Sequence, residues 1–483
     1  MPEKFTKIVS TIGPASRNYE TILSLINEGV NVFRLNFSHG NTEDHKLSVD
    51  LVRRASRELD KTVAIFQDLQ GPKIRVGNLK DEYIELAAGD KIIISGGDFE
   101  GTKGHISIDY NNLHNEVCKD GRILIDDGLI ELRVDEVDGK NIHTVVVTGG
   151  KLKPRKGVNL PHVKLQNISS FTEKDMEDLK FAFENYLDYI ALSFVRSAND
   201  VIALRNYMSK EFGRTIPVIS KIEKPEAVDD IDNIIEVSDA IMVARGDLGV
   251  ETSSEEVPII QKRIIRKCNL AGKPVITATQ MLESMINNPR PTRAESADVA
   301  NAILDGSSAI MLSGETAVGK YPVESVQMMT KIALFTESTV MFKKLVLEKV
   351  INIDLLRENA LHNTPQAVGL ATVELADTLG AKYIVCFTHS GGTARLISKF
   401  RPDMKIIGFS PVASTVRRLA LAWGVIPLHI SEVETVDELL DGAAEALKYK
   451  GMVKDGDFIV ITAGVPVGKT GKTNMIKVVR IGE

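Results

Sequence analysis

The sequence is poor in several features that mark particular classes of protein. It contains 3 cysteines, 1 tryptophan and 5% aromatic residues in a chain of 483 residues. Cys118, Cys268 and Cys386 lie too far apart for a metal-ligand spacing, so they predict reduced thiols in a cytoplasmic protein. The low aromatic content argues against surfaces that stack nucleic-acid bases.

Neither charge nor hydrophobicity is strongly biased. The 59 Lys and Arg residues against 65 Asp and Glu leave a net charge of −6, which gives no reason to expect a nucleic-acid partner. No apolar run reaches the length of a transmembrane helix, and residues 1–18 lack the apolar core of a signal peptide. The 43% hydrophobic and 26% charged residues predict a globular protein, with a prior of roughly three domains.

Short apolar runs alternate with helical stretches along much of the chain. The runs cover residues 7–14, 31–38, 62–69, 189–195, 217–223, 240–248, 274–281 and 308–315. Their Val, Ile and Leu content is typical of strands buried on both faces, and the segments between them have a helical period. Eight such strand–helix pairs predict a closed (β/α)₈ TIM barrel rather than an open sheet.

Two stretches do not belong to this rhythm. Residues 125–150 alternate with a period of two around hairpin-like turns, which predicts a small all-β domain inserted in a barrel loop. After about residue 340 the pattern restarts as a separate α/β domain. We therefore expect the barrel at 1–70 and 170–342, the inserted lid at 71–169 and the C-terminal domain at 343–483.

Charged and polar residues stand at the carboxyl ends of the predicted strands, where TIM barrels carry their chemistry. The ends include Arg34, Asn36, Ser38, Asp68, Lys221, Glu223, Arg245, Asp247, Thr277, Thr279, Gln280 and Glu315. Strand alternation places Lys221 with Glu223, and Arg245 with Asp247, on common faces.

Two of these carboxylates, Glu223 and Asp247, suit Mg²⁺, which takes one or two protein carboxylates and fills its other positions with water and substrate. Lys221 and Arg34 add positive charge, as phosphoryl transfer requires. The alternative is a structural ion-pair network at the barrel mouth. Against it stands the desolvation free energy of burying charges that have no function.

The motifs KIVSTIGP, LNFSHG, DLQGPKIR, SKIEKPEA, ARGDLGVE, ITATQMLESM and MLSGETAVGKYP together resemble those of pyruvate kinases. The resemblance covers the barrel, the insertion and, more loosely, the C-terminal domain. It implies transfer of a phosphoryl group from phosphoenolpyruvate to ADP, giving pyruvate and ATP, in a Mg²⁺-dependent homotetramer, with Mn²⁺ as an alternative ion. It implies no nucleic-acid or membrane partner.

The resemblance also implies roles for individual residues. Arg34, Lys221 and Thr279 are expected to be catalytic, with Gly246 and Asp247 also binding substrate and Glu223 and Asp247 holding the metal. The nucleotide is expected near Asn36, Ser38, His39, Arg75 and Lys156.

One departure from the family pattern concerns its monovalent cation. Many members read DTKGPEIRT and require K⁺, whereas this chain reads DLQGPKIRV from Asp68 to Val76. The cation region comprises Asn36, Ser38, Asp68 and Leu69, and the ammonium of Lys73 could supply the charge that K⁺ supplies elsewhere. We therefore predict a K⁺-independent enzyme; a solvated lysine at the base of the lid is the alternative.

The C-terminal domain carries a predicted phosphate nest at a strand–helix junction, formed by Thr388, Ser390, Gly391, Gly392 and Thr393. In the family this region receives a phosphorylated allosteric effector. Residues 464–470 superficially resemble a nucleotide-binding P-loop, but only three residues separate the glycines where four are needed, so we reject a second nucleotide site.

Two other functions compete with phosphoryl transfer. A barrel aldolase would use Lys221 as a Schiff base, but the neighbouring Glu223 favours an ionised ammonium, which is a poor nucleophile. A catalytically inactive sensor of a phosphometabolite would need only the C-terminal nest, and the full set of charged strand ends argues against it.

Overall fold

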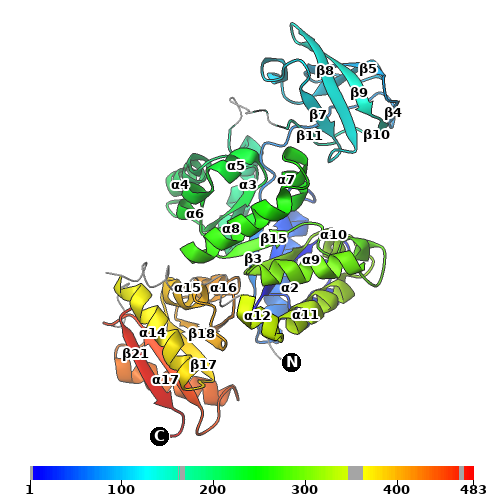
Figure 1. Cartoon of the computed structure of the whole chain (residues 1–483). Coiled ribbons are helices and arrows are strands. Elements are labelled where there is room, and N and C mark those ends of the chain that lie inside the picture. Colours follow the sequence, from blue (N-terminus) through cyan, green and yellow to red (C-terminus); the bar gives the residue numbers. More distant parts are fainter. Residues whose placement is uncertain (1–3, 162, 164–168, 346–362, 467–472) are drawn as a thin grey trace.

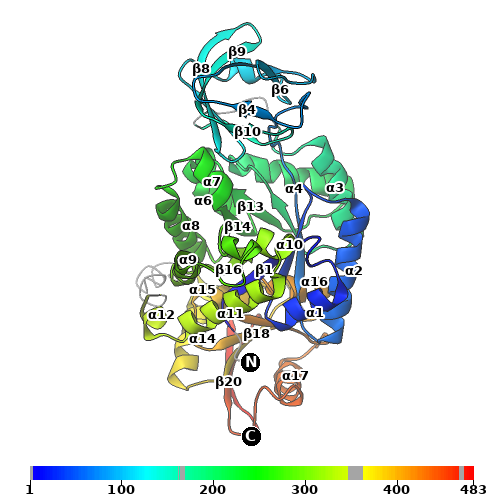
Figure 2. The same ribbon diagram turned by 90° about the vertical axis from the view of Figure 1, so that its right-hand side faces the viewer.

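The computed structural model describes residues 4–161, 163, 169–345, 363–466 and 473–483. Three parts follow one another along the molecule, with a β-rich domain at one end, a barrel in the middle and an α/β domain at the other end (Figure 1). Turning the molecule by 90° shows the same order, with the barrel helices on the outside (Figure 2). No helix in the described ranges is long and apolar enough to cross a membrane.

The central part is a closed barrel of eight parallel strands. Each strand lies within one of the eight apolar runs: β1 (Lys7–Ile12), β2 (Val32–Asn36), β3 (Ala64–Asp68), β12 (Tyr189–Leu192), β13 (Val218–Ile222), β14 (Ala240–Ala244), β15 (Val275–Ala278) and β16 (Ala309–Leu312). Pairing runs β1-β16-β15-β14-β13-β12-β3-β2 and closes on β1. Nearly every strand residue is buried, since one face meets the helices and the other fills the lumen. The predicted TIM barrel is confirmed.

Helices cover the outside of the barrel. They are α1 (Tyr19–Asn27), α2 (Thr42–Glu58), α3 (Glu173–Glu184), α4 (Ala198–Phe212), α5 (Pro225–Asp229), α6 (Ile231–Val237), α7 (Arg245–Glu251), α8 (Val257–Ala271), α9 (Arg293–Leu304), α10 (Gly314–Ala317), α11 (Pro322–Glu337) and α12 (Val340–Leu345), with a 3₁₀ turn η2 (Glu283–Ile286). N-terminal capping fixes where some of these helices begin. Thr172 caps α3 and Thr292 caps α9, each through a capping box. Gly272, at φ +69°, ends α8 in the left-handed conformation.

The inserted domain leaves the barrel after β3 and returns before α3. It contains β4 (Ile84–Leu86), β5 (Lys91–Gly96), β6 (His105–Ile108), η1 (Leu113–Asn115), β7 (Arg122–Ile125), β8 (Ile130–Asp138), β9 (Asn141–Thr148), β10 (Gly150–Leu152) and β11 (Val158–Asn159). Six strands form one sheet in the order β11-β7-β8-β9-β5-β6, and β10 pairs with β4. The domain has its own apolar core, as the alternating pattern predicted.

The C-terminal domain is a five-stranded sheet with helices. Its elements are α14 (Thr364–Thr378), β17 (Tyr383–Phe387), α15 (Gly392–Lys399), β18 (Lys405–Ser410), α16 (Ala413–Leu419), β19 (Val425–His429), α17 (Val436–Tyr449), β20 (Phe458–Ala463) and β21 (Met475–Arg480). The order is β19-β18-β17-β20-β21, and only β21 is antiparallel. The segment 464–470, for which we rejected a P-loop, lies between β20 and β21 in the chain. Its residues 467–470 lie outside the described ranges.

The C-terminal domain covers the amino-terminal end of the barrel strands. Ala420 and Leu421 join the apolar cluster that fills the barrel lumen. The Lys7 ammonium donates to the Val425 carbonyl at 2.6 Å, and the Tyr189 hydroxyl donates to the Arg418 carbonyl at 2.9 Å. The opposite, carboxyl end of the barrel faces the inserted domain (Figure 1).

A buried carboxylate also ties the C-terminal domain to the barrel. Asp188 is fully buried and accepts from Arg53 at 2.9 Å, from Arg417 on α16 at 2.7 Å and from the Ile65 N–H at 2.9 Å. We expect Asp188→Ala to lower the free energy of unfolding by about 3 kcal/mol, because it leaves two partly buried guanidinium groups without their partner. Urea denaturation followed by circular dichroism measures the change.

Asp50→Ala is the matched control, since Asp50 forms an exposed i,i+4 pair with Lys46 at 2.9 Å and we expect a change of about 0.5 kcal/mol or less. Equal unfolding midpoints for the two variants would show that the Asp188 cluster does not hold the two parts together.

Candidate active site

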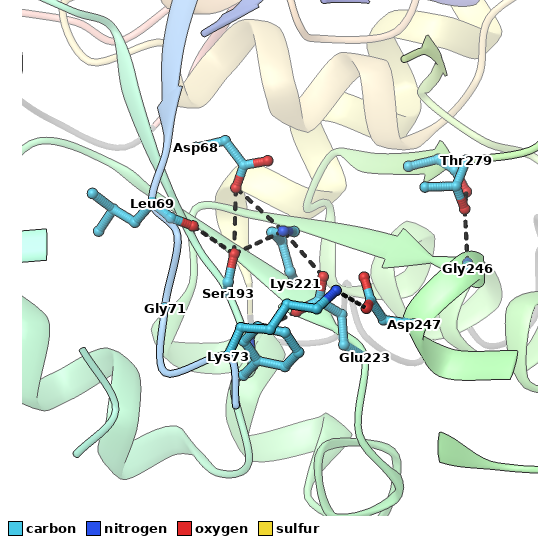
Figure 3. A network of polar contacts seen from close by, with 12 residues as sticks. Asp68, Leu69, Gly71, Lys73, Ser193, Lys221, Glu223, Gly246, Asp247 and Thr279 are labelled. Carbon is cyan, nitrogen blue, oxygen red and sulfur yellow. Dashed lines mark hydrogen bonds and ion pairs between the residues drawn. The ribbon is translucent and has the colours of Figure 1, made fainter. Parts of the chain in front are cut away.

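Lys221 lies at the carboxyl end of β13, surrounded by acceptors from three strands. Its ammonium is 3.0 Å from Glu223 Oε1, 3.3 Å from Asp68 Oδ1 and 2.7 Å from the Ser193 hydroxyl (Figure 3). Burial opposes the charged form, but Asp68 and Glu223 outweigh it and hold the pKa of Lys221 above its ordinary value. The amine therefore stays protonated, which is unsuitable for a Schiff-base nucleophile.

Asp68, at the end of β3, connects Lys221 to Arg34 on β2. Arg34 Nε donates to Asp68 Oδ2 at 2.6 Å, and Arg34 Nη1 donates to the Thr11 hydroxyl of β1 at 3.2 Å. Burial disfavours the Asp68 carboxylate, yet Lys221 and Arg34 lower its pKa below the ordinary value. The carboxylate is thus ionised and holds two cations at the barrel mouth.

Glu223 and Asp247 form the acidic side of the site. Glu223 Oε2 accepts from the Phe194 N–H at 2.7 Å, whereas its buried Oε1 makes no hydrogen bond, although it lies within ion-pair distance of Lys221. Burial raises the pKa of Glu223; Lys221 opposes this and the nearby Asp247 adds to it.

A buried carboxylate next to a second carboxylate fits a divalent cation. Within the described residues, no three His, Cys, Asp or Glu side chains gather around one point as a metal site. A cation at Glu223 and Asp247 would therefore take its remaining ligands from water and substrate, which is the usual arrangement for Mg²⁺.

Thr279 follows β15 on the other side of the site. Its hydroxyl accepts from the Gly246 N–H at 2.8 Å and donates to the Ala278 carbonyl at 2.6 Å (Figure 3). Thr279 and Gln280 have φ values of +68° and +53°. Positive φ is uncommon for any residue other than glycine, and it is most unusual for the β-branched Thr279. Such strain persists only where surrounding contacts maintain it, and it concentrates at functional sites.

Arg245 supplies those contacts. Its guanidinium donates to the Thr279 carbonyl at 2.6 Å and pairs with Asp298 at 2.7 Å. The expected strand alternation of Arg245 and Asp247 is wrong, because β14 ends at Ala244 and both residues belong to α7. Arg245 therefore holds the β15 loop, while Asp247 faces the site.

Lys73 reaches the site from the base of the inserted domain. Its ammonium lies 3.2 Å from Asp247 Oδ1 and 3.9 Å from Asp127 (Figure 3). It also lines a hollow of about 450 Å³ between the inserted domain and the barrel. On the wall of this hollow, Glu251 of α7 binds Lys224 at 2.7 Å and Asn159 of β11 at 2.7 Å.

The residues expected near a nucleotide come from the end of β2, the turn that follows it and the inserted domain. Asn36 Oδ1 accepts from the Ser38 N–H at 3.2 Å in the turn after β2. Burial lowers the pKa of His39, with further lowering from Arg75, Arg34 and Lys73, so positive charge surrounds this ring. Lys156 pairs with Asp126 at 2.8 Å within the inserted domain.

Some polar strand ends do not belong to the site, and one site residue was overlooked. Glu315 is buried and accepts from the Leu282 and Ser313 N–H groups, while Thr277 bonds Ser307 at 2.7 Å, so both support the barrel. Ser193 instead contacts Lys221 and donates to the Leu69 carbonyl at 2.7 Å. Its place within the fourth apolar run (189–195), directly after the end of β12 at Leu192, was the available signal.

The predicted phosphate nest lies at the start of α15, far from the barrel mouth (Figure 1). The Gly391 N–H donates to the Thr388 hydroxyl at 2.9 Å, and Thr393 bonds Thr473 at 2.9 Å. Gly391 has φ +84°, which glycine adopts without strain.

Comparisons with known proteins agree with this geometry. The chain matches the family models "Pyruvate kinase, barrel domain" over residues 3–326 and "Pyruvate kinase, alpha/beta domain" over residues 366–479. It is 48% identical over 480 residues to pyruvate kinases of Staphylococcus aureus strains MRSA252 and USA300, covering 99% of this chain and 80% of each relative. A crystal structure of a pyruvate kinase from Cryptosporidium parvum has a TM-score of 0.90 and 38% identity, covering 99% of this chain and 96% of that one. The chain therefore belongs to the pyruvate kinase family and is a phosphotransferase.

Proposed function

We propose that this enzyme transfers the phosphoryl group of phosphoenolpyruvate to ADP, giving pyruvate and ATP, at the barrel mouth. The observation that carries the proposal is the protonated ammonium of Lys221, held by Asp68, Glu223 and Ser193. A fixed cation on the path of a migrating phosphoryl group stabilises the charge that develops on its oxygens. Arg34, positioned by Asp68, adds a second cation to the same group.

Glu223 and Asp247 would hold Mg²⁺, or Mn²⁺ in its place. When bound, the ion supplies charge neutralisation and a template for substrate oxygens. Gly246 and Asp247 at the start of α7 lie beside the proposed substrate carboxylate, and Thr279 lies beside the proposed enolate carbon. The hydrogen bond between Thr279 and Gly246 fixes the threonine hydroxyl there.

Asn36, Ser38, His39, Arg75 and Lys156 are proposed to bind the nucleotide between the barrel and the inserted domain. Closure of the inserted domain over the hollow would exclude water, which would otherwise hydrolyse the phosphoryl donor. Lys156 would exchange its partner Asp126 for a phosphate as the nucleotide binds.

We further propose that the enzyme needs no K⁺. The region of Asn36, Ser38, Asp68 and Leu69 lies near Lys73, whose ammonium is 3.2 Å from the Asp247 carboxylate. A tethered ammonium in this position supplies a permanent positive charge beside the substrate anions.

The activity and its ion requirements are tested in one coupled assay with phosphoenolpyruvate, ADP and Mg²⁺. We expect equal turnover in KCl and in tetramethylammonium chloride, and none after Mg²⁺ is removed. Lys73→Glu should make turnover depend on K⁺, because it replaces the cation by a group that repels the substrate. Lys153→Glu, an exposed charge reversal in the same domain, is the control.

Wild-type activity that disappears without K⁺ would contradict the K⁺ proposal while leaving phosphoryl transfer intact. Absence of ATP formation under every condition would contradict the function itself, leaving an inactive sensor. A borohydride-trapped pyruvate adduct at Lys221 would instead indicate an aldolase.

We also propose that Thr388, Ser390, Gly391, Gly392 and Thr393 bind a phosphorylated activator and that the enzyme is a homotetramer. The hydroxyl groups and backbone of the nest at the start of α15 support the first of these proposals.

A further inference from the structure

A second concentration of positive charge lies where the C-terminal domain meets the barrel. An open pocket with about 260 Å³ of empty space is lined by Asn269, Gly272, Lys273, Pro274, Ser308, Arg395, Ser398, Lys399, Arg401, Ala422 and Trp423. Four of these residues are cationic and none is acidic. The pocket is at the amino-terminal end of β15 and β16, so the full length of the barrel separates it from Lys221.

Arg401 is the central group of this pocket. It is 3% exposed, and its Nη2 donates to Asn269 Oδ1 at 2.7 Å and to the Gly306 carbonyl at 2.8 Å. Its Nε and Nη1 are buried and have no hydrogen-bond partner. A guanidinium with two buried donors left unpaired is costly unless a ligand accepts them.

Among the residues that the structure describes, no carboxylate pairs with the Arg401 guanidinium. Glu337 is the acid that affects Arg401, but its oxygens already accept from the Phe5 and Thr6 N–H groups at 2.7 Å. Burial lowers the pKa of Arg401 to about 9, and the group still carries its charge at neutral pH.

The other three cations come from both sides of the junction. Lys273 belongs to the barrel, and its pKa is lowered by burial and, in part, by the positive charge of Arg395. Asp239, which opposes that shift, is already paired with Arg205. Burial also lowers the pKa of Lys399 at the end of α15, whose ammonium donates to the neutral side chain of Gln366 at 3.2 Å. Like charges held together without a counterion predict an anionic ligand.

We propose that this pocket binds a small phosphate-type dianion, bridging Arg395, Lys399 and Arg401 of the C-terminal domain to Lys273 of the barrel. The pocket adjoins the nest at Thr388–Thr393, because Arg395 Nη1 donates to the Ser390 carbonyl at 3.2 Å. Lys399 and Arg401 lie at the opposite end of α15, away from the nest. Planar guanidinium groups suit the paired oxygens of such an anion. The bound anion would stabilise the junction by neutralising charges that otherwise repel across it.

The proposal is tested by isothermal titration of the full-length protein with inorganic phosphate at constant ionic strength. Lys399→Met and Lys273→Met, which keep the apolar stems, should each weaken this binding about tenfold or more. Lys477→Met on exposed β21 is the control that should leave it unchanged. Crystals soaked in tungstate should show an oxygen of the anion within hydrogen-bond distance of Arg401 Nε.

Repeating the titration with glycerol 3-phosphate distinguishes the two sources of the anion: tighter binding than phosphate indicates a metabolite ester, and equal binding indicates free phosphate. The proposal is overturned if the lysine variants bind phosphate as the wild type does. It is also overturned if tungstate occupies only the nest or the barrel mouth, or if another copy of the chain covers the pocket and no anion enters.

Discussion

Lys221→Met should lower kcat by about 10³-fold, equivalent to about 4 kcal/mol of transition-state stabilisation, while phosphoenolpyruvate still binds. The ammonium is buried among Asp68, Glu223 and Ser193, so no mobile cation can easily replace it. Methionine keeps the length and apolar stem of lysine and removes only the charge. Turnover in the coupled assay, together with substrate binding by calorimetry, separates loss of chemistry from loss of binding.

Lys262→Met is the matched control, because Lys262 also pairs with an aspartate, Asp305, but is half-exposed on the outer helix α8. We expect its kcat to equal that of the wild type. Lys221→Met turnover close to wild type would remove Lys221 from the mechanism, and failure to bind substrate would make it a binding residue only.

Glu223→Gln and Asp247→Asn should each lower turnover at a fixed, low Mg²⁺ concentration by about 10²-fold or more. Each replaces a charged oxygen ligand by a neutral one, which removes several kcal/mol of charge stabilisation. Part of the loss should be recovered at high Mg²⁺, because the remaining carboxylate and the substrate oxygens still bind the ion weakly. Electron paramagnetic resonance of Mn²⁺ measures the affinity directly.

The control for these variants is Glu255→Gln, an exposed carboxylate in the connection between α7 and α8. It should change neither Mn²⁺ affinity nor turnover. If Glu223→Gln and Asp247→Asn bind Mn²⁺ as tightly as the wild type, the metal is held elsewhere and the two carboxylates serve only to position Lys221 and Lys73.

The barrel was predictable because its strands are buried on both faces, which requires continuous apolar runs of limited length. The polar residues that end these runs then met at one rim, since parallel strands in a barrel finish at the same end. This reasoning brought Arg34, Asp68, Lys221 and Glu223 together correctly. The family resemblance singled out Lys73, whose ammonium lies 3.2 Å from Asp247; its role in place of K⁺ stays a prediction.

The prediction that Arg245 and Asp247 share one face of a strand was wrong, because strand alternation applies only while the strand continues. The strand β14 ends at Ala244 and α7 begins at the next residue, and nothing local in the sequence marks this change. Ser193 was overlooked because a single serine within an apolar run has no distinctive pattern. Glu315 and Thr277 looked like site residues but satisfy nearby backbone and hydroxyl groups.

The sequence by itself determined the barrel, the inserted β domain, the C-terminal α/β domain and most of the charged residues at the barrel mouth. These follow from periodicity and strand direction, which act over short distances along the chain. Only the tertiary structure decided which polar groups pair with one another, such as Lys221 with Glu223, and which remain without a hydrogen bond, such as the two free donors of Arg401. Hydrogen bonding and burial depend on residues far apart in sequence, so the balance of charge at each site is a property of the folded molecule.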